Sequence, residues 1–585
     1  MKFLGNVMAT IVGIFVFFML FFFGILLIGA IFGGETEGIE VKNNSVIELN
    51  LDDISNDYAG KYKDPWMDVF SEKKNVGLTD VINAIAAAKT DGDIKGISIL
   101  NQESQLGLAQ SKELREALND FKKSGKFVLA YANDLTQRDY YLNSVANSIY
   151  LNPAGDIDFK GLSTEIMFFK DLQEKSGVKM EVIRHGKYKS AVEPFLENKM
   201  SDANREQTTA LLNSIWSSVL EDISTSRHIP ISRLNEIATG LLARTPEMAK
   251  ANKLIDVVAY EDVYHNAIKK ALKVTGDDDY NKVSMTDYAQ KVNTTSLLSE
   301  TDNQIAVIYA QGEIQSGEGD VNVIGEGSMR RSFQEARKNK DIKAIVLRVD
   351  SPGGSALTSD LIWREIELTK KIKPVVVSMG NYAASGGYYI SCNANTIFAE
   401  KNTITGSIGV FGVLPNFSQL STRIGINTEQ ITTNENANYS PFVPLNEKFR
   451  GVTLQGIERV YKTFLHHVAE GRKMTVAQVD SIAQGRVWTG TEAQRIGLVD
   501  KIGNLNDALK EAASLAKIKD YSTQNFPEYE KDFNDLIGKF PFVKSKEALI
   551  KEEIGEENYF ILQKIKKVQL QKGIQARMPF EISIQ

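Results

Sequence analysis

Ser385 lies in a run of small residues that could expose its hydroxyl group as a nucleophile. Residues 380–389 read GNYAASGGYY and separate an expected strand from an expected helix. A serine on such a sharp turn needs small neighbours, and the N–H groups at the start of the helix can stabilise a negatively charged oxygen. The same serine could instead cap the helix with its side chain. The pattern therefore makes Ser385 a candidate nucleophile and leaves the helix cap open as the alternative.

A glycine pair follows another expected strand upstream of this run. Residues 350–355 read DSPGGS. Consecutive glycines let the backbone turn sharply and direct N–H groups into a cavity. Gly353 and Gly354 are therefore candidates for stabilising the oxyanion that forms when a serine attacks a carbonyl group. A plain turn is the alternative reading of this pair.

A serine nucleophile needs a general base, and Lys189 is the candidate for that role. It lies in residues 185–195, which read HGKYKSAVEPF. Lysine can accept the serine proton when desolvation lowers its pKa from about 10.4 towards neutrality. Taken alone, Lys189 would more often be a solvated surface residue. His185 lies nearby, but no local pattern of histidine and acid supports a Ser-His-Asp triad.

The two halves of the chain repeat one pattern at a constant offset of 248 residues. The matching pairs include Asp93 and Asp341, Tyr140 and Tyr388, Ala146 and Ala394, Gly161 and Gly409, and Gly177 and Gly425. These matches run without a gap from residue 93 to residue 177 of the first copy, which indicates a duplicated unit. Two unrelated α/β domains are the alternative.

The two copies differ where the chemistry would lie. At the same offset Ser385 matches Gln137, and Lys189 matches Ala437. One half thus offers a serine without a lysine, and the other a lysine without a serine. We expect the two half-sites to complete one Ser–Lys dyad across the junction between the copies.

Strands and helices alternate in both copies, which predicts a mostly parallel sheet covered by helices. The expected strands are 95–100 and 126–131 in the first copy and 343–349 and 374–378 in the second, with helices near 111–123 and 359–371. The expected units are an N-terminal anchor (1–44), a first α/β repeat with the lysine (45–200), a helical connector (201–300), a second α/β repeat with the serine (301–515) and a C-terminal tail (516–585).

The N-terminus carries an apolar segment that could cross a membrane. Val7 to Phe32 contains no charged residue over 26 positions, and about 20 suffice for a transmembrane helix. A cleaved signal peptide is the alternative, although its apolar core is usually shorter. Lys2 precedes the segment and weakly favours a cytoplasmic N-terminus. We therefore predict a single-pass protein whose bulk lies outside the cytoplasm.

Composition excludes several other classes of protein. The 585 residues carry 68 Lys and Arg against 74 Asp and Glu, without a dense basic run, so no nucleic-acid partner is expected. The single cysteine, Cys392, excludes an intrachain disulfide and a CxxC zinc site, and we expect it to be packed in the core. The sequence contains neither an HExxH pair nor a Walker A motif, which excludes zincins and P-loop NTPases.

Four motifs together resemble the signal peptide peptidase A (protease IV) family, in its long, duplicated, membrane-anchored form. They are YKSAVEPF at 188–195, DSPGG at 350–354, ASGGYY at 384–389 and TGSIGV at 405–410. The resemblance implies tandem Clp-protease/crotonase-like α/β domains and a serine endopeptidase that uses no metal ion or cofactor. It further implies a homotetramer in the bacterial inner membrane that degrades cleaved signal peptides and other apolar peptides.

The resemblance also implies a role for each candidate residue. Ser385 would be the nucleophile, Lys189 the general base, and Ser407 the hydroxyl group that orients the lysine amine. The N–H of Gly386, with that of Gly353 or Gly354, would form the oxyanion hole. Two alternatives stay open: a crotonase-type acyl-CoA enzyme, which would form no covalent serine adduct, and a membrane-anchored scaffold that has lost catalysis.

Overall fold

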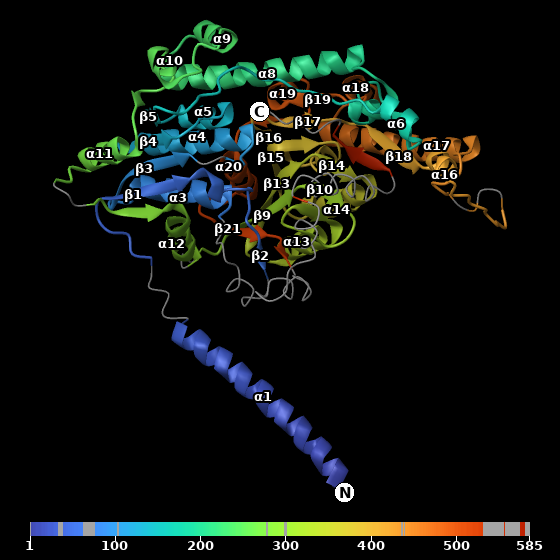
Figure 1. Cartoon of the computed structure of the whole chain (residues 1–585), viewed down its shortest axis with the longest axis horizontal. Helices are drawn as coiled ribbons and strands as arrows, with labels where there is room; N and C mark the ends of the chain where they lie inside the picture. Colours follow the sequence, from blue (N-terminus) through green and yellow to red (C-terminus); the bar gives the residue numbers. More distant parts are fainter. Residues whose placement is uncertain are drawn as a thin grey trace.

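The computed structural model describes residues 2–32, 39–62, 76–101, 104–275, 279–297, 301–434, 437, 439–529, 555 and 574–578. Two parallel sheets lie side by side, with helices on their faces and one long helix standing apart (Figure 1). The α/β class and the parallel sheets predicted from the alternation of strands and helices are confirmed.

The first sheet has the strand order β8-β1-β3-β4-β5-β7, and every neighbouring pair is parallel. Its strands are apolar on both faces, as expected for a parallel sheet covered by helices. The strand bounds are β1 Ser45–Asn50, β3 Ile94–Asn101, β4 Phe127–Ala132, β5 Ser148–Leu151, β7 Val257–Val258 and β8 Lys282–Ser284.

The second sheet repeats this order as β21-β9-β13-β15-β16-β20, again with parallel neighbours. β17 continues beside the end of β15, and β19 pairs with β17 in the antiparallel direction. The bounds are β9 Gln304–Gln311, β13 Ile342–Ser351, β15 Val375–Ala384, β16 Thr396–Ala399, β17 Ile404–Gly406, β19 Val487–Thr489, β20 Lys501–Ile502 and β21 Ser522–Phe526.

The helices repeat as well. α13 and α14 begin and end 248 residues after α3 and α4, which is the offset found in the sequence. The remaining helices are shorter or pack around the ends of the sheets. The first-half bounds are α3 Leu78–Thr90, α4 Leu108–Lys122, α5 Gln137–Asn143, α6 Lys170–Ser176, α7 Glu193–Leu196, α8 Asp202–Arg227, α9 Ile231–Thr239, α10 Pro246–Ala251, α11 Glu261–Leu272 and α12 Met285–Leu297, with 3-10 turns at Leu51–Asp53 and Ser190–Val192. The second-half bounds are α13 Glu326–Lys338, α14 Ala356–Lys370, α15 Gly386–Tyr389, α16 Ser418–Arg423, α17 Glu447–Arg472, α18 Val476–Ile482, α19 Gly490–Arg495 and α20 Leu505–Ala516.

The region expected as a helical connector, residues 201–300, also takes part in the first sheet. It contains α8 to α12 and contributes β7 beside β5 and β8 beside β1. Its long helix α8 has 26 residues, as does α17 at the corresponding place in the second half. Residues 202–272 thus follow the repeat pattern in addition to linking the halves.

A third, mixed sheet joins the two halves. Its order is β11-β12-β10-β14-β23-β18-β6, and it brings the first-half strand β6 against the second-half strand β18. The other bounds are β6 Lys179–His185, β10 Glu313–Gln315, β11 Gly319–Asp320, β12 Val323–Gly325, β14 Gly353–Ser355, β18 Val410–Asn416 and β23 Gln575–Arg577; a separate pair is β2 Lys61–Tyr62 with β22 Glu528–Tyr529. This sheet joins segments that are far apart in the sequence, and it thereby aligns the two half-sites.

A buried arginine also holds the halves together. The Arg348 side chain on β13 is 1% exposed and lies 2.6 Å from Asp57 Oδ2 and 2.7 Å from Glu113 Oε1, two carboxylates of the first half. A buried guanidinium is tolerated when its N–H groups are paired in this way. Burial raises the pKa of Glu113 to about 7, although Arg348 acts in the opposite direction.

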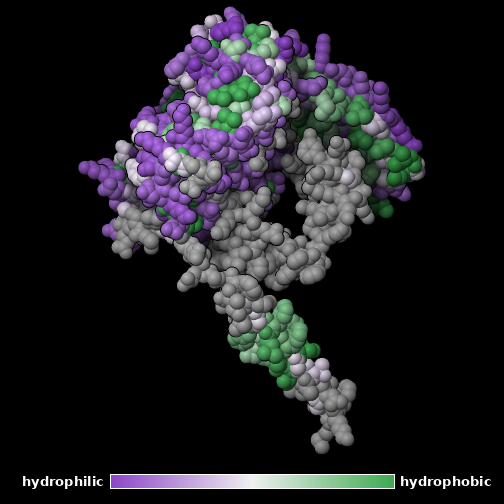
Figure 2. All heavy atoms as spheres, turned by 60° about the vertical axis from the view of Figure 1, so that its left-hand side comes forward, coloured by the Kyte–Doolittle hydropathy of each residue, from purple (hydrophilic) through white to green (hydrophobic). Residues whose placement is uncertain are grey.

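The N-terminal helix α1, Lys2–Phe32, stands apart from the α/β body (Figure 1). Of the predicted span 7–32, the side chains of residues 10–24 are described and the others lie outside the described residues. Within the described part of the chain we find no helix that is long and apolar enough to cross a membrane. The apolar side chains between Ile11 and Phe23 are exposed, and they form the green surface of this helix in Figure 2.

The predicted C-terminal tail, residues 516–585, is described in part. β21 extends the second sheet beside β9, and β23 enters the mixed sheet between β14 and β18. Residues 530–554, 556–573 and 579–585 of this tail lie outside the described residues. With β22, which pairs with β2, the chain after 516 thus contributes strands to three sheets.

Candidate active site

Ser385 occupies a strained turn between β15 and α15. Its backbone has φ 54° and ψ −111°, a conformation that costs a non-glycine residue free energy and is concentrated at functional sites. The Ser385 N–H donates to Gly406 O at 2.8 Å, which fixes the turn. The neighbours are necessarily small, because a Cβ atom on Gly387 would lie 2.7 Å from Ser351 O. The side chain makes no capping hydrogen bond to the helix, which argues against the capping alternative.

Lys189 reaches Ser385 because β6 crosses into the second half. β6 pairs antiparallel with β18, with His185 opposite Val410, and the chain then turns back towards the end of β15. Lys189 is fully buried, in contrast to the surface lysine that its local sequence would suggest. Its Nζ lies 2.9 Å from Ser385 Oγ. The two half-sites separated by 196 residues therefore meet within one chain.

Ser407 is the third member of this buried group. Its Oγ lies 2.9 Å and its carbonyl oxygen 3.0 Å from Lys189 Nζ. Ser407 has φ 51°, and its N–H donates to Arg486 O at 2.7 Å, so its position is fixed by the backbone. Both oxygens can accept hydrogen bonds from the amine and thereby orient it.

Burial lowers the pKa of Lys189 well below that of an exposed lysine. A neutral amine has two N–H bonds and one lone pair. The carbonyl oxygen of Ser407 can only accept a hydrogen bond, and it takes one from the first N–H. The Ser407 hydroxyl group can accept a hydrogen bond from the second N–H. The lone pair then faces the hydroxyl group of Ser385, which can donate to it. This arrangement suits proton transfer from serine to lysine.

Two residues that position Lys189 were not identified from the sequence. Gly485 has φ 82°, and a Cβ atom there would lie 2.6 Å from Lys189 N, so only glycine allows this approach. Gln207 on α8 donates to Tyr188 O at 3.1 Å and to Ser190 Oγ at 2.9 Å, on either side of Lys189. Gly485 lies far from residues 185–195 in the sequence, Gln207 lies 17 residues after Ser190, and no local motif marks either of them.

The candidate oxyanion glycines adjoin Ser385. Gly353 and Gly354 have φ 99° and 156°, and a Cβ atom on Gly353 would lie 2.8 Å from Gly386 N. The Gly353 N–H donates to Ser351 Oγ at 3.2 Å. Its neighbour Gly354 is therefore better placed to donate to a ligand together with Gly386. The sequence left the choice between Gly353 and Gly354 open.

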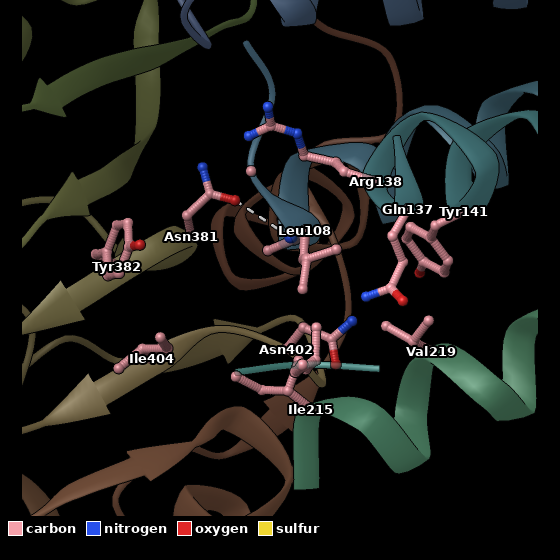
Figure 3. Close-up of a pocket in the computed structure, with 13 residues that line it drawn as sticks. Leu108, Gln137, Arg138, Tyr141, Ile215, Val219, Asn381, Tyr382, Asn402 and Ile404 are labelled. Atoms are coloured by element: carbon pink, nitrogen blue, oxygen red, sulfur yellow. Dashed lines mark hydrogen bonds between the residues drawn. The ribbon is translucent and has the colours of Figure 1, made fainter. Parts of the chain in front are cut away.

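The corresponding place in the first half has no serine. Gln137 begins α5, and its Oε1 accepts from Gly161 N at 2.8 Å while its Nε2 donates to Gly161 O at 2.9 Å. Figure 3 shows that Gln137 lines a pocket with Leu108, Ile215 and Asn402. Among the described residues, neither Ser385 nor Lys189 lines this pocket. This pocket is therefore separate from the Ser–Lys site.

Other candidate groups are structural. Cys392 is buried in the core of the second half, as expected. The ring of His185 packs on Tyr461 with centroids 4.3 Å apart. The nearest described partners of Ser385 are a lysine amine and the Gly409 carbonyl, which do not form a histidine triad.

Ser407→Ala should lower kcat by about 10- to 100-fold and leave KM nearly unchanged. The substitution removes one hydrogen bond that orients the Lys189 amine, a loss of about 1–3 kcal/mol in transition-state positioning. Steady-state kinetics on a fluorogenic peptide measures this split. Ser481→Ala, an exposed serine, provides the control. An unchanged kcat would show that the Ser407 carbonyl alone orients the amine.

Comparisons with known proteins show which proteins this chain is similar to. The chain is 36% identical over 513 residues to "Protease 4" of Haemophilus influenzae, covering 84% of this chain and 83% of the relative. It is 32% identical over 484 residues to "Serine protease SPPA, chloroplastic" of Arabidopsis thaliana, covering 82% and 70%. Among solved structures, a point mutant of ClpP1 from Listeria monocytogenes has a TM-score of 0.24 at 17% identity and covers 35% of this chain and 94% of that one.

These relatives define the class of protein as a serine peptidase. The chain belongs to peptidase family S49, whose sequence model matches residues 120–275 and again residues 367–519. The two matches begin 247 residues apart, close to the offset of the internal repeat. The first match contains Lys189 and the second contains Ser385 and Ser407. The predicted duplication and the predicted enzyme class are confirmed, while the Clp-protease/crotonase-like fold stays a prediction beyond the α/β class.

Proposed function

We propose that this serine peptidase cleaves peptides through a Ser–Lys dyad of Ser385 and Lys189. The observation that carries the proposal is the 2.9 Å separation of Lys189 Nζ and Ser385 Oγ in a fully buried environment. A buried amine is easily kept neutral, and a neutral amine beside a serine is a general base. The strained Ser385 supplies the nucleophile of an acyl-transfer site, and the N–H groups of Gly354 and Gly386 supply its oxyanion hole.

The mechanism follows from these positions. Lys189 takes the proton of Ser385 as Oγ attacks the peptide carbonyl, and the N–H groups of Gly354 and Gly386 stabilise the oxyanion. The protonated lysine then donates to the leaving amine, which breaks the C–N bond. A water molecule then attacks the ester carbonyl while Lys189 takes its proton, and the lysine passes this proton to Ser385 Oγ as the ester bond breaks.

Covalent labelling tests the nucleophile. A fluorophosphonate probe should attach to Ser385 in the full-length enzyme, and peptide mapping should place the adduct in residues 380–389. Ser385→Ala should lose both the adduct and cleavage of an apolar peptide. Cleavage without an adduct, or an adduct on another serine, would contradict the proposal. A crotonase-type enzyme or an inactive scaffold would show no cleavage.

The pH profile tests the neutral lysine. Only the deprotonated amine can act as a base, so kcat/KM should fall as the pH is lowered through the pKa of Lys189. Because burial lowers this pKa, the midpoint should lie well below the value of about 10.4 for a free lysine. Fluorogenic peptide assays between about pH 5 and pH 10 measure the profile. A midpoint near the free value would contradict a neutral base at physiological pH.

We further propose that α1 anchors the enzyme in the bacterial inner membrane. Its described surface is apolar, with Phe15 69% and Leu20 68% exposed, a surface that favours lipid over water. The proposed orientation has a cytoplasmic N-terminus and an extracytoplasmic catalytic body. The proposed substrates are cleaved signal peptides and other apolar peptides, which remain near the bilayer.

Carbonate extraction of membranes tests the anchor. The full chain should sediment with the membranes, whereas a chain lacking residues 2–38 should stay in the supernatant and still cleave soluble peptides. Extraction of the full chain into the supernatant would contradict anchoring. We also propose that the enzyme forms the homotetramer that the family resemblance implies. Light scattering of the detergent-solubilised enzyme should then give the mass of four chains, and the mass of one chain would contradict this proposal.

A further inference from the structure

The pocket of Figure 3 lies at the place in the first half that corresponds to the active site of the second half. Gln137 and Arg138 line it, and at the repeat offset of 248 residues they match Ser385 and Gly386. The pocket has about 670 Å³ of empty space, counting the part that is open to solvent, so a ligand can enter from outside. The first half has thus kept a cavity where it has no serine nucleophile.

Asn402 is a buried polar group of this pocket that lacks a partner. Its side chain is 3% exposed, and neither Nδ2 nor Oδ1 forms a hydrogen bond within the described part of the chain. Figure 3 shows its amide group directed towards the side of the pocket that Gln137 and Val219 form. An unpaired buried amide lowers stability, and a partner that binds from outside explains why it is there.

Arg138 is a second group without a partner. It is half-buried, its Nε forms no hydrogen bond, and it has no ion pair with any described residue. Figure 3 shows its side chain extending from α5 towards Asn381. The Asn381 amide is already used, because its Oδ1 accepts from Ala109 N at 3.2 Å and its Nδ2 donates to Asp350 Oδ2 at 3.1 Å. A guanidinium without a counterion favours an anion with two oxygens, such as a carboxylate.

The rest of the pocket is mostly apolar and carries no negative charge. No acidic residue is among the described residues that line it. Apolar side chains from α4, α8 and β17 form most of its walls. They are Leu108, Leu162, Ile215, Val219 and Ile404. A ligand that fits this pocket therefore combines a carboxylate with an apolar side chain.

We propose that this pocket binds the carboxyl end of an apolar peptide. Arg138 pairs with the terminal carboxylate, and the apolar walls contain the last side chain. Asn402 Oδ1 accepts the N–H of the residue before it, and Asn402 Nδ2 donates to the C=O of that same residue. These two groups point to one side when a peptide is extended, so one side-chain amide can pair with both. The choice of ligand rests on the proposed function, because peptide cleavage produces such ends.

The pocket shares two strands with the active site. Tyr382 of β15 and Ile404 of β17 line the pocket and are paired with each other. Three residues further along the chain lie Ser385 and Ser407, respectively. Three extended residues span about 10 Å. A peptide end released at Ser385 is therefore produced close to the pocket that would bind it.

Isothermal titration calorimetry tests the ligand. The detergent-solubilised full-length Ser385→Ala enzyme should bind N-acetyl-Leu-Leu at one site per chain. The same compound with a carboxyl-terminal amide lacks the charge and should bind about 10- to 100-fold more weakly. Octanoate keeps a carboxylate and an apolar chain but has no peptide group, and it should also bind more weakly. Equal binding of all three compounds would overturn the inference.

Two substitutions in the Ser385→Ala background test the site. Arg138→Gln and Asn402→Leu should each weaken binding of N-acetyl-Leu-Leu by at least about tenfold. Neither should lower the melting temperature without ligand, because both side chains lack partners in the free protein. Arg205→Gln, at an exposed arginine of α8, is the matched control and should keep the affinity. Unchanged binding by the two pocket variants, or a lower melting temperature of both, would contradict the proposed site.

Cleavage of an apolar peptide by the wild type separates this inference from the proposed function. If the wild type cleaves that peptide but Ser385→Ala does not bind N-acetyl-Leu-Leu, the binding site is wrong and the proposed function stands. If binding depends on Arg138 and Asn402 but the wild type cleaves nothing, the proposed function is wrong and the binding site stands.

Discussion

Lys189→Met should lower kcat/KM of the peptidase by about 10⁴-fold or more. Methionine fills a similar volume but cannot accept the Ser385 proton or return it to the leaving amine. The amine is the group 2.9 Å from Ser385 Oγ, and no second base among the described residues forms a hydrogen bond with that hydroxyl group. Steady-state kinetics on a fluorogenic apolar peptide measures the loss.

A neighbouring lysine offers the matched control. Lys187 is exposed, with its Nζ 5.3 Å from the ring centroid of Tyr188, and Lys187→Met should leave kcat/KM within about twofold because surface charges contribute little. Lys189→Arg should be as inactive as Lys189→Met, since a guanidinium stays protonated. Substantial activity in either Lys189 variant would require a different base.

Arg348→Met should lower the free energy of unfolding by about 3–5 kcal/mol. The substitution removes the cation that lies against Asp57 and Glu113 and leaves these buried carboxylates without it. Urea denaturation followed by circular dichroism measures the change. Arg233→Met, which breaks an exposed ion pair with Glu236, should cost less than about 0.5 kcal/mol.

The destabilisation by Arg348→Met should grow as the pH rises. The pKa of Glu113 is about 7 in the folded protein, above its usual value, so the folded state holds a proton that the unfolded state has released. A raised acid pKa favours folding at low pH and loses that contribution as the pH rises through the folded value. Without Arg348 this pKa should rise further. A smaller loss at pH 8 than at pH 5 would contradict a carboxylate origin.

Local patterns predicted much of the fold because the period of a helix or strand is set by neighbouring residues. The strands at 343–349 and 374–378 lie within β13 and β15 to within a residue, as does the helix near 359–371 within α14. The region 201–300 was harder to predict, because β7 and β8 are two and three residues long. Such short strands exist only through pairing with β5 and β1.

The candidate site was predicted by comparing the two copies. In the repeat, Gln137 corresponds to Ser385 and Ala437 corresponds to Lys189, so neither half holds both the serine and the lysine. This comparison could not identify Gly485 or Gln207, because their roles depend on contacts with residues 188–190 that only the folded chain makes. It also could not place β23, Gln575–Arg577, which follows a long stretch without a diagnostic motif.

The sequence by itself determined the duplicated α/β pattern, the small-residue turn around Ser385 and the separation of serine and lysine between the copies. All of these depend on residue type and short spacing. Only the tertiary structure decided that Lys189 is buried beside Ser385 and that β23 pairs with β14, the strand of the candidate oxyanion glycines. Both facts arise from strand pairing between distant segments, β6 with β18 and β23 with β14. Their register is set by the packing of the two halves and leaves no local signal in the sequence.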